Sequence, residues 1–379
     1  MKIVYCVSQL AHKGGAERIV ISKANALVSR FDCEVHILIA DQKNRPICYP
    51  LDERVICHDM HVSSLVTKYV IPGVTFLYMI YKLRRIYTKK LEAIAPDVVS
   101  VIERGYDDFV IPFICKEIPK IREFHLSREA ANIKSDNVVG LCQRIKTKCL
   151  NRIVYSQFDK YDMVVLLTQR DKLYANYSTS VCVIPNFIPQ LPPQVSNLET
   201  KQVISVGRLD RNKNFRDQIL AWKIVQAKHP DWKLMIYGEG EERENLQKMI
   251  EKENLIDKVF LCGVSDDIYT KYLNSSMLLF TSRAEGFGMV LIEGMSLGLP
   301  CISYDSPCGP SEIIKSNNNG YLLDMDDWKG LADKILFLID NPGIRKQMGR
   351  NARITAQMYT QSMVMPHWIE LFKKMKNKK

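Results

Sequence analysis

Two glutamates, Glu285 and Glu293, stand on either side of the glycine-containing stretch Gly286-Phe287-Gly288. A carboxylate accepts hydrogen bonds from sugar hydroxyls, and glycine lets the backbone approach a ligand closely. A helix that begins after such glycines directs its first N–H groups toward an anion. These residue types therefore suit a ligand that carries both phosphate and hydroxyl groups. The alternative is an ordinary loop in which Glu293 is a solvated helix residue.

The neighbouring sequence supplies the elements that would position these residues. The apolar run Met277–Phe280 predicts a strand, the residues after the glycines have a helical period, and Cys301–Tyr304 predicts a second strand. This order is one βαβ unit, whose loop lies at the carboxyl end of the first strand, where open α/β sheets bind ligands. Glu285 lies in the loop and Glu293 about one turn into the helix, so we expect both to face the same pocket.

A second glycine-containing loop follows the predicted strand Ile3–Val7. Gly14 and Gly15 precede a segment of helical period, so the chain begins with a strand, a loop and a helix. Backbone N–H groups in such a loop can bind an anion. The loop matches neither the dinucleotide pattern GxGxxG nor the phosphate-binding loop that ends in lysine and serine or threonine. The glycine pair alone is therefore weak evidence.

A basic pair, Arg208 and Lys213, follows the predicted strand Val203–Val206. Arginine offers a planar fork of donors and lysine a mobile point charge, and together they suit a diphosphate. The alternative is two ordinary surface cations.

A histidine, His125, ends the strand predicted over Lys120–His125. Because the unperturbed pKa of histidine is about 6.5, such a residue at a cleft can orient or deprotonate a hydroxyl. The alternative is a histidine whose hydrogen bonds are satisfied by its neighbours. Arg128 and Glu129 follow in the same loop and are candidates to contact an acceptor.

Taken in chain order, these motifs resemble a known family. Gly207-Arg208-Leu209 precedes Lys213-Asn214-Phe215, seven residues separate Glu285 from Glu293, and Gly-Leu-Pro (298–300) and Gly-Pro-Ser-Glu (309–312) follow. The pattern resembles the nucleotide-binding signature of the retaining glycosyltransferases of family 4, which have the GT-B fold. The resemblance is strong for residues 203 to 320 and looser for residues 41 to 160.

The resemblance implies how a nucleotide-sugar would be bound. Glu293 would hold the ribose hydroxyls, and Arg208 and Lys213 would hold the diphosphate. Other residues at matching positions would also contact the donor, namely Gly14 and Gly15 at its phosphates, Gly207 beside the basic pair, and Gly263 and Val264 at its base, mostly through the backbone.

The resemblance also implies a set of catalytic residues: Glu285, His125, Arg208 and Lys213. Glu285 and the N–H groups of residues 286–288 would hold the donor sugar. Arg208 and Lys213 would neutralise the diphosphate as it gains charge in the transition state. The departing phosphate would itself take the proton of the acceptor on the same face of the sugar, and His125 would position groups between donor sugar and acceptor.

The expected fold class is α/β of the GT-B type, with two Rossmann-like domains facing across a cleft and a C-terminal helix crossing back to the N-terminal domain. The alternating order of predicted strands and helices supports both sheets independently of the resemblance. We expect an N-terminal acceptor domain at residues 1–188 and a Pro-rich linker at 189–200. A nucleotide-sugar-binding domain at 201–360 and a crossover helix with a basic tail at 361–379 would follow. Trp368 and Phe372, one helical turn apart, are the expected anchors of that helix.

The charge of the chain indicates an anionic partner. The formal net charge is +11 and the sequence pI is about 9.0. No recognised nucleic-acid-binding module is present, so we expect no nucleic acid partner. Basic residues lie among apolar or aromatic residues over Phe76–Ile94 and over 131–160, and five of the last seven residues of the chain are lysine. These segments predict contact with an anionic membrane surface, and solvated helix faces are the alternative.

The start of the chain lacks the pattern of a signal peptide, and no uncharged apolar run is long enough to span a bilayer. We therefore expect a cytoplasmic protein at the inner face of a bacterial plasma membrane. The 11 cysteines show no CxxC pair, and most lie inside apolar runs, among them Cys57, Cys182 and Cys262, so we expect free, buried thiols and no zinc site. No Asp-x-Asp motif ends a predicted strand, so we expect neither a metal nor another cofactor.

The function that we expect is transfer of a sugar, with retention, from a nucleotide-sugar to a glycan or polyprenyl-diphosphate-linked acceptor in polysaccharide biosynthesis. A UDP-sugar is preferred over a GDP-sugar on the family resemblance alone. Two alternatives remain: an enzyme similar to the UDP-N-acetylglucosamine 2-epimerases, and a basic binding protein without catalytic activity.

Overall fold

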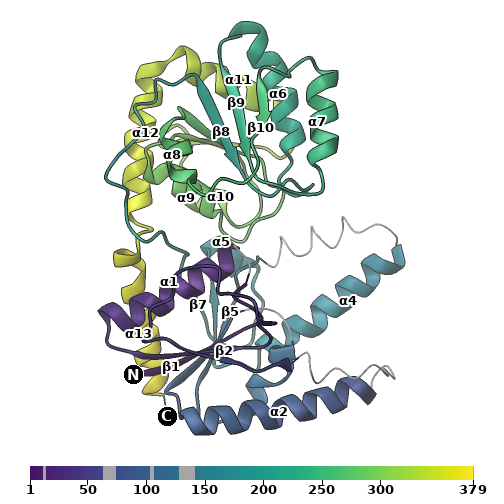
Figure 1. Ribbon diagram of the computed structural model, residues 1–379, viewed down its shortest axis with the longest axis vertical. Coiled ribbons are helices and arrows are strands. Elements are labelled where there is room, and N and C mark those ends of the chain that lie inside the picture. Colours follow the sequence, from purple (N-terminus) through teal and green to yellow (C-terminus); the bar gives the residue numbers. More distant parts are fainter. Residues whose placement is uncertain (12–13, 63–73, 103–105, 128–140, 379) are drawn as a thin grey trace.

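The computed structural model describes residues 1–11, 14–62, 74–102, 106–127 and 141–378 (Figure 1). The expectations for Arg128, Glu129 and residues 131–140 lie outside these ranges. The described strands form two separate parallel sheets, each enclosed by helices.

The N-terminal domain is built on a seven-stranded sheet with the order β3-β2-β1-β4-β5-β6-β7, in which every pair of neighbours is parallel. Most of these strands are continuous apolar runs, as expected for strands that are covered on both faces. Their bounds are β1 Lys2–Val7, β2 Glu34–Ile39, β3 Ile56–Asp59, β4 Val98–Val101, β5 Lys120–Glu123, β6 Met163–Leu166 and β7 Val181–Val183.

Helices cover both faces of this sheet, and alternate residues of β1 show which helix covers which face. Tyr5 packs in one core with α1 (Gly15–Arg30), and Val4 packs in another core with α2 (Val74–Ile94). The domain also contains α4 (Leu141–Phe158), α5 (Gln169–Tyr174) and the short 3-10 helices η2 (Tyr106–Phe109) and η3 (Ile111–Phe113).

The C-terminal domain has a six-stranded parallel sheet with the order β10-β9-β8-β11-β12-β13. Its strands are β8 Gln202–Val206, β9 Lys233–Tyr237, β10 Val259–Leu261, β11 Met277–Phe280, β12 Cys301–Tyr304 and β13 Gly320–Leu323. One core joins the sheet to α6 (Phe215–Lys228), α7 (Arg243–Lys252) and α11 (Trp328–Asp340). Another joins it to α8 (Ile268–Leu273), α9 (Met289–Ser296), α10 (Pro310–Ile313) and α12 (Pro342–Gln357).

The last helix, α13 (Gln361–Lys376), returns to the N-terminal domain, where it lies against the same side of the sheet as α1 (Figure 1). Trp368 and Phe372 are buried there, and the ring of Phe372 packs edge-on against Tyr5 with 6.5 Å between centroids. The predicted fold, two Rossmann-like domains with a crossover helix, is therefore confirmed. The exact domain and linker boundaries stay predictions.

Two further expectations can be compared with the described residues. The ten described cysteines are all free, but Cys57, Cys182 and Cys262 are only half-buried, because each lies at a sheet edge or strand end. Among the helices that the structure describes, none combines the length and the apolar character needed to cross a bilayer.

Candidate active site

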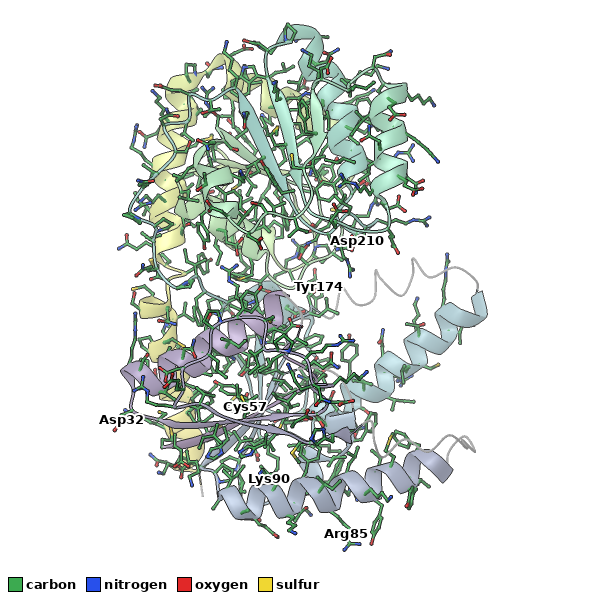
Figure 2. The ribbon with its side chains drawn as sticks, viewed as in Figure 1. Asp32, Cys57, Arg85, Lys90, Tyr174 and Asp210 are labelled. Atoms are coloured by element: carbon green, nitrogen blue, oxygen red, sulfur yellow. The ribbon has the colours of Figure 1, made fainter. Side chains whose placement is uncertain are left out.

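A cavity of about 770 Å³ lies between the two domains. The N-terminal domain lines it with α1 and residues 48–50, and the C-terminal domain lines it with α8, α9 and the loops after β8, β9 and β10. Carboxyl ends of parallel strands are the usual ligand-binding edge of such sheets. In Figure 2, Asp210, which follows β8, lies at the edge of the C-terminal domain that faces Tyr174 at the end of α5.

Glu293 is the buried acid of this cavity. It lies on α9, is 6% exposed and lines the cavity wall. Arg18 donates to it with 2.7 Å between Nη1 and Oε1, and the Tyr272 hydroxyl lies 3.4 Å from Oε2. Burial raises the pKa of Glu293, while Arg18 and Tyr272 act in the opposite direction. The result is a desolvated carboxylate with acceptor capacity toward the cavity, which suits the hydroxyls of a ribose.

Arg18 is a residue of this site that sequence reasoning missed. It comes from α1 of the N-terminal domain and crosses the cleft to reach α9 of the C-terminal domain. The available signal was its place one turn into the helix that begins at Gly15, next to a loop expected to bind phosphate. A single arginine at a helix start is common on protein surfaces, so this signal was weak.

Glu285 and Lys213 form the second ion pair of the site, with 2.5 Å between Oε1 and Nζ. Glu285 turns to Lys213 while Glu293 lines the interdomain cavity, and the expectation that both face one pocket stays a prediction. Lys213 belongs to the same domain as Glu285, so this ion pair does not cross the cleft. The aliphatic part of the Lys213 side chain lies against Gly207, where an added Cβ would be 3.3 Å from Lys213 Cδ.

Arg208 does not share the environment of Lys213. Its side chain is 75% exposed and pairs with Asp210 at 2.7 Å, although Arg208 and Gly207 both line the cavity. Arg208 is therefore free to reorient toward an anion in the cavity, since a surface ion pair contributes little.

The glycines after Glu285 are required by close approach and by backbone conformation. A Cβ on Gly286 would lie 2.2 Å from the backbone oxygen of His125, so only glycine fits where the two domains touch. Gly288 has a φ of 97° and caps the N-terminus of α9. The loop with Glu285 is thus pressed against the end of β5, which places Glu285 and His125 on the two sides of one contact.

His125 is held by an acidic neighbour. Its Nε2 lies 3.0 Å from Oε2 of Glu123, and its side chain is 12% exposed. Burial lowers the pKa of His125, although Glu123 opposes that shift, so the ring is neutral at pH 7. Its Nδ1 is buried and has no hydrogen-bond partner among the described residues.

Of the remaining predicted donor contacts, Gly14, Gly15, Gly263 and Val264, the last is the one in the cavity lining. Gly14 caps α1, and a Cβ on Gly15 would meet nothing within 4 Å, so the backbone there is open. Gly263 has a φ of 73° and accepts a hydrogen bond from the Gly238 N–H. Val264 follows it, is 70% exposed and lines the cavity.

The Gly-Pro-Ser-Glu motif at 309–312 lies at a second domain contact. Glu312 accepts a hydrogen bond from the backbone N–H of Arg170 on α5 at 2.8 Å, and the Arg170 guanidinium lies 3.1 Å from the hydroxyl of Ser311. Arg170 also pairs with Asp305 at 2.8 Å. This motif therefore helps to join the domains in the present structure.

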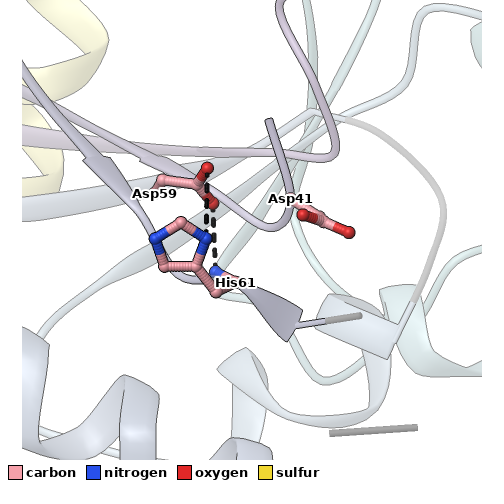
Figure 3. A group of neighbouring side chains, drawn as sticks. All are labelled: Asp41, Asp59 and His61. Atoms are coloured by element: carbon pink, nitrogen blue, oxygen red, sulfur yellow. Dashed lines mark hydrogen bonds and ion pairs between the residues drawn. The ribbon is translucent and has the colours of Figure 1, made fainter. Parts of the chain in front are cut away.

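Among the residues that the structure describes, one group could offer metal ligands: Asp41, Asp59 and His61, at the ends of β2 and β3 (Figure 3). Asp59 is already engaged by the backbone N–H groups of Gln42 and His61, and His61 is exposed. None of the three lines the interdomain cavity. The expectation of a metal-independent site stays a prediction.

Comparison with known proteins agrees with this geometry. Residues 189–355 match the family Glycosyl transferases group 1. An uncharacterized glycosyltransferase of Haemophilus influenzae is 26% identical over 97% of this chain and 98% of its own length. The amylovoran biosynthesis glycosyltransferase AmsD of Erwinia amylovora is 27% identical over 98% of this chain and 99% of its own length.

A solved structure extends the likeness to the fold. TarM of S. aureus, crystallised with UDP, aligns with a TM-score of 0.76 and 18% identity over 98% of this chain and 99% of its own. These matches support the predicted enzyme class, a glycosyltransferase, whereas family 4 and retention stay predictions. Residues 189–355, less than half of the chain, are similar to the Glycosyl transferases group 1 model, and the two domains together have a GT-B fold.

Proposed function

We propose that this protein transfers a sugar, with retention, from a UDP-sugar to a glycan or polyprenyl-diphosphate-linked acceptor in bacterial polysaccharide biosynthesis. The observation that carries the proposal is Glu293, a buried carboxylate in the wall of a cavity at the carboxyl edge of the second sheet. The presence of UDP in the TarM crystal and the role of AmsD in amylovoran biosynthesis support the choice of donor and of pathway class.

In this proposal the nucleoside lies in the interdomain cavity. Ribose hydroxyls donate to Glu293, and the base lies along the backbone of Gly263 and the side chain of Val264. The diphosphate lies toward Gly207, where Arg208 and Lys213 can reach it. Gly14 and Gly15 offer open backbone N–H groups from the opposite domain.

Chemistry then takes place where the loop of Glu285 meets the backbone of His125. Glu285 and the N–H groups of residues 286–288 hold the donor sugar. As the bond from the sugar to the diphosphate breaks, negative charge grows on the leaving phosphate, and Lys213 and Arg208 stabilise it. That phosphate takes the proton of the acceptor hydroxyl on the same face, which gives retention. We propose that the charges of Lys213 and Arg208 suffice for this step and that it needs no metal.

The acceptor side of the protein carries features suited to a lipid surface. On α2, Leu77 is 69% and Tyr81 is 57% exposed, and on α4, Leu150 is 58% exposed. Basic side chains lie among them, and Lys82 and Arg85 pack over the rings of Tyr78 and Tyr81. Both helices project from the same side of the N-terminal domain (Figure 1). We propose that this face contacts anionic lipid headgroups, where a lipid-linked acceptor would be found.

Calorimetric titration of UDP, GDP and ADP into the full chain in EDTA tests the donor proposal. We expect UDP to bind and the other two to bind more weakly. Preference for GDP would change the donor and keep the fold. Binding only after Mn²⁺ or Mg²⁺ is restored would contradict the metal-independent site. Binding of none of them, with salt-sensitive binding to nucleic acid, would favour a non-catalytic basic protein.

If UDP binds, a panel of UDP-sugars with membrane lipid extracts identifies the sugar, and a product that forms without acceptor would indicate an epimerase.

A further inference from the structure

A buried group of three charged or titratable residues lies behind the cleft in the N-terminal domain. Lys23 on α1 and Glu123 at the end of β5 form an ion pair, and both side chains are at most 1% exposed. The Glu123 oxygen that meets Lys23 also meets Nε2 of His125, while Ser100 donates to the other oxygen at 2.7 Å. The three donors converge on one carboxylate, and His125, with a side chain that is 12% exposed, is the least buried of the residues that meet there.

The charge of Glu123 is fixed by these neighbours. Burial alone would raise its pKa, but Lys23 and the hydrogen bond from His125 outweigh burial and hold the pKa of Glu123 at about 2. Burial lowers the pKa of His125, and Lys23 and Arg122 add to that effect. Arg122 is itself paired with Asp108 at 2.6 Å. At neutral pH, therefore, an ionised carboxylate faces a neutral imidazole.

This combination selects one tautomer. A carboxylate accepts hydrogen bonds and donates none, so Nε2 of His125 must carry the proton of their 3.0 Å contact. In a neutral ring the other nitrogen, Nδ1, is then a bare acceptor. Nδ1 is buried and has no partner among the residues described here, and a buried acceptor without a partner is uncommon in proteins.

The place of His125 indicates which molecule supplies the missing donor. Its backbone oxygen touches the position where Gly286 has no side chain, so the histidine adjoins the loop of Glu285. A sugar or an acceptor bound there presents hydroxyls, and a hydroxyl is the donor that a bare imidazole nitrogen can use.

We propose that Lys23 and Glu123 are positioning residues that hold His125 in the Nε2–H tautomer, so that Nδ1 accepts a hydrogen bond from a substrate hydroxyl. The proposal rests on the proposed function for the identity of the substrate, whereas the tautomer itself does not. His125 then acts by accepting a hydrogen bond in a fixed direction, and the leaving phosphate remains the base.

The crossover helix is part of this arrangement. The ring of Trp368 on α13 lies 4.0 Å from Nζ of Lys23, and the ring of Tyr5 lies at 5.2 Å. A cation held over aromatic faces is stabilised where water is excluded. The helix that returns from the C-terminal domain thus packs directly against the cation that fixes Glu123, which explains how a buried lysine is accommodated on the apolar face of α1.

The experiment reads the tautomer and the kinetics in the same full-length variants. Glu123→Leu removes both the charge and the hydrogen-bond acceptor but leaves Lys23 unpaired, so Lys23→Met with Glu123→Leu removes both charges together and guards against misfolding. Nitrogen chemical shifts of His125, assigned with His125→Gln, report the protonated ring nitrogen, and thermal melting reports folding. Glu253→Gln, at an exposed pair with Lys223, is the matched control that keeps the wild-type tautomer and rate.

We expect the Nε2–H tautomer in the wild-type protein and its loss in both Glu123 variants. With UDP affinity unchanged, kcat should fall on the order of tenfold or more, as for other residues that act through an orienting hydrogen bond. An equal fall in acceptor-independent hydrolysis of the UDP-sugar assigns the hydroxyl to the donor, and a rise in KM for the acceptor alone assigns it to the acceptor. Both results support the proposal.

Two results would overturn it: an Nδ1–H tautomer in the wild-type protein, or a folded double variant with wild-type kcat. Because the tautomer is read without substrate, the tautomer assignment can hold even if the protein binds no UDP. Failure of the proposed function and failure of this inference are therefore distinguishable.

Discussion

The two sides of the cleft are built in different ways. On the C-terminal side, Glu285 and Glu293 come from one loop and the helix that follows it, and Lys213 comes from the first loop of the same sheet. On the N-terminal side, Arg18 comes from α1 and His125 from the end of β5, and no short segment joins them. A site formed by one segment is visible as a motif, whereas a site assembled from distant segments depends on the tertiary fold.

The two glutamates, both on the C-terminal side, differ in the domain that supplies their partner. Glu285 is neutralised within its own domain by Lys213, while Glu293 is neutralised across the cleft by Arg18. A nucleotide in the cavity would hydrogen-bond to Glu293 while Arg18 of the opposite domain is paired with the same carboxylate. A donor sugar would instead contact Glu285, which Lys213 of the same domain already holds in place. This comparison predicts that changes at Glu285 affect turnover, and that changes at Glu293 and Arg18 affect binding.

The largest effect is expected for Glu285→Ala. It removes the proposed acceptor for the donor sugar and frees Lys213, so kcat should fall roughly 100- to 1,000-fold, the range for loss of a group that acts mainly in the transition state. UDP affinity should change far less. Steady-state kinetics with calorimetry separates the two quantities, and full activity of the variant would remove Glu285 from the site.

The next effect is expected for Glu293→Ala. A hydrogen bond to a charged group contributes about 1.5–3 kcal/mol, so UDP should bind roughly 10- to 100-fold more weakly. Thermal melting is needed beside the titration, because the change also leaves Arg18 without its partner. UDP affinity equal to that of the wild type would contradict the ribose assignment.

Arg18→Gln tests whether the opposite domain controls Glu293. Burial already raises the pKa of Glu293 and Arg18 opposes that shift, so removing Arg18 raises the pKa further. Because the ionised carboxylate accepts from the ribose, UDP affinity should be lost as the pH falls, and the loss should begin at a higher pH in the variant. Near neutral pH we expect an affinity loss of about tenfold or less.

Titration of UDP across pH 5 to 8 gives the pH dependence of UDP affinity. Arg18→Lys should restore most of the wild-type affinity and pH dependence, because the positive charge returns. Tyr272, Tyr269 and Tyr49 also face Glu293, but tyrosines stay neutral over this range. A pH profile identical in wild type and Arg18→Gln would show that Glu293 is not held by Arg18 in solution.

The same comparison explains what could be predicted from the sequence. Apolar runs separated by helical segments predict both sheets, because most of the parallel strands away from the sheet edges are buried on both faces. Glu293, Lys213 and the glycines were found because their spacing is local. Arg18 was missed, and so was Lys23, because a lysine within the apolar period of a helix suggests a solvated position. Its burial depends on Glu123 and Trp368, which lie about 100 and 345 residues away in the sequence.

The smallest effect is expected at the outer face of α2, where Arg85 is exposed and its guanidinium lies over Tyr81, on the side of the helix away from the C-terminal domain (Figure 2). One basic residue near an anionic membrane contributes about 1 kcal/mol, so Arg85→Gln should weaken binding to phosphatidylglycerol vesicles about fivefold. Lys252→Gln removes the same charge at an exposed position of α7 in the other domain and should leave vesicle binding unchanged. Cosedimentation measures both variants, and raised salt should narrow the gap between them. Equal losses of vesicle binding in the two variants would mean that the net charge of the protein, rather than the N-terminal face, attracts it to the membrane. The two domains would then differ in how they bind substrate but not in how they bind lipid.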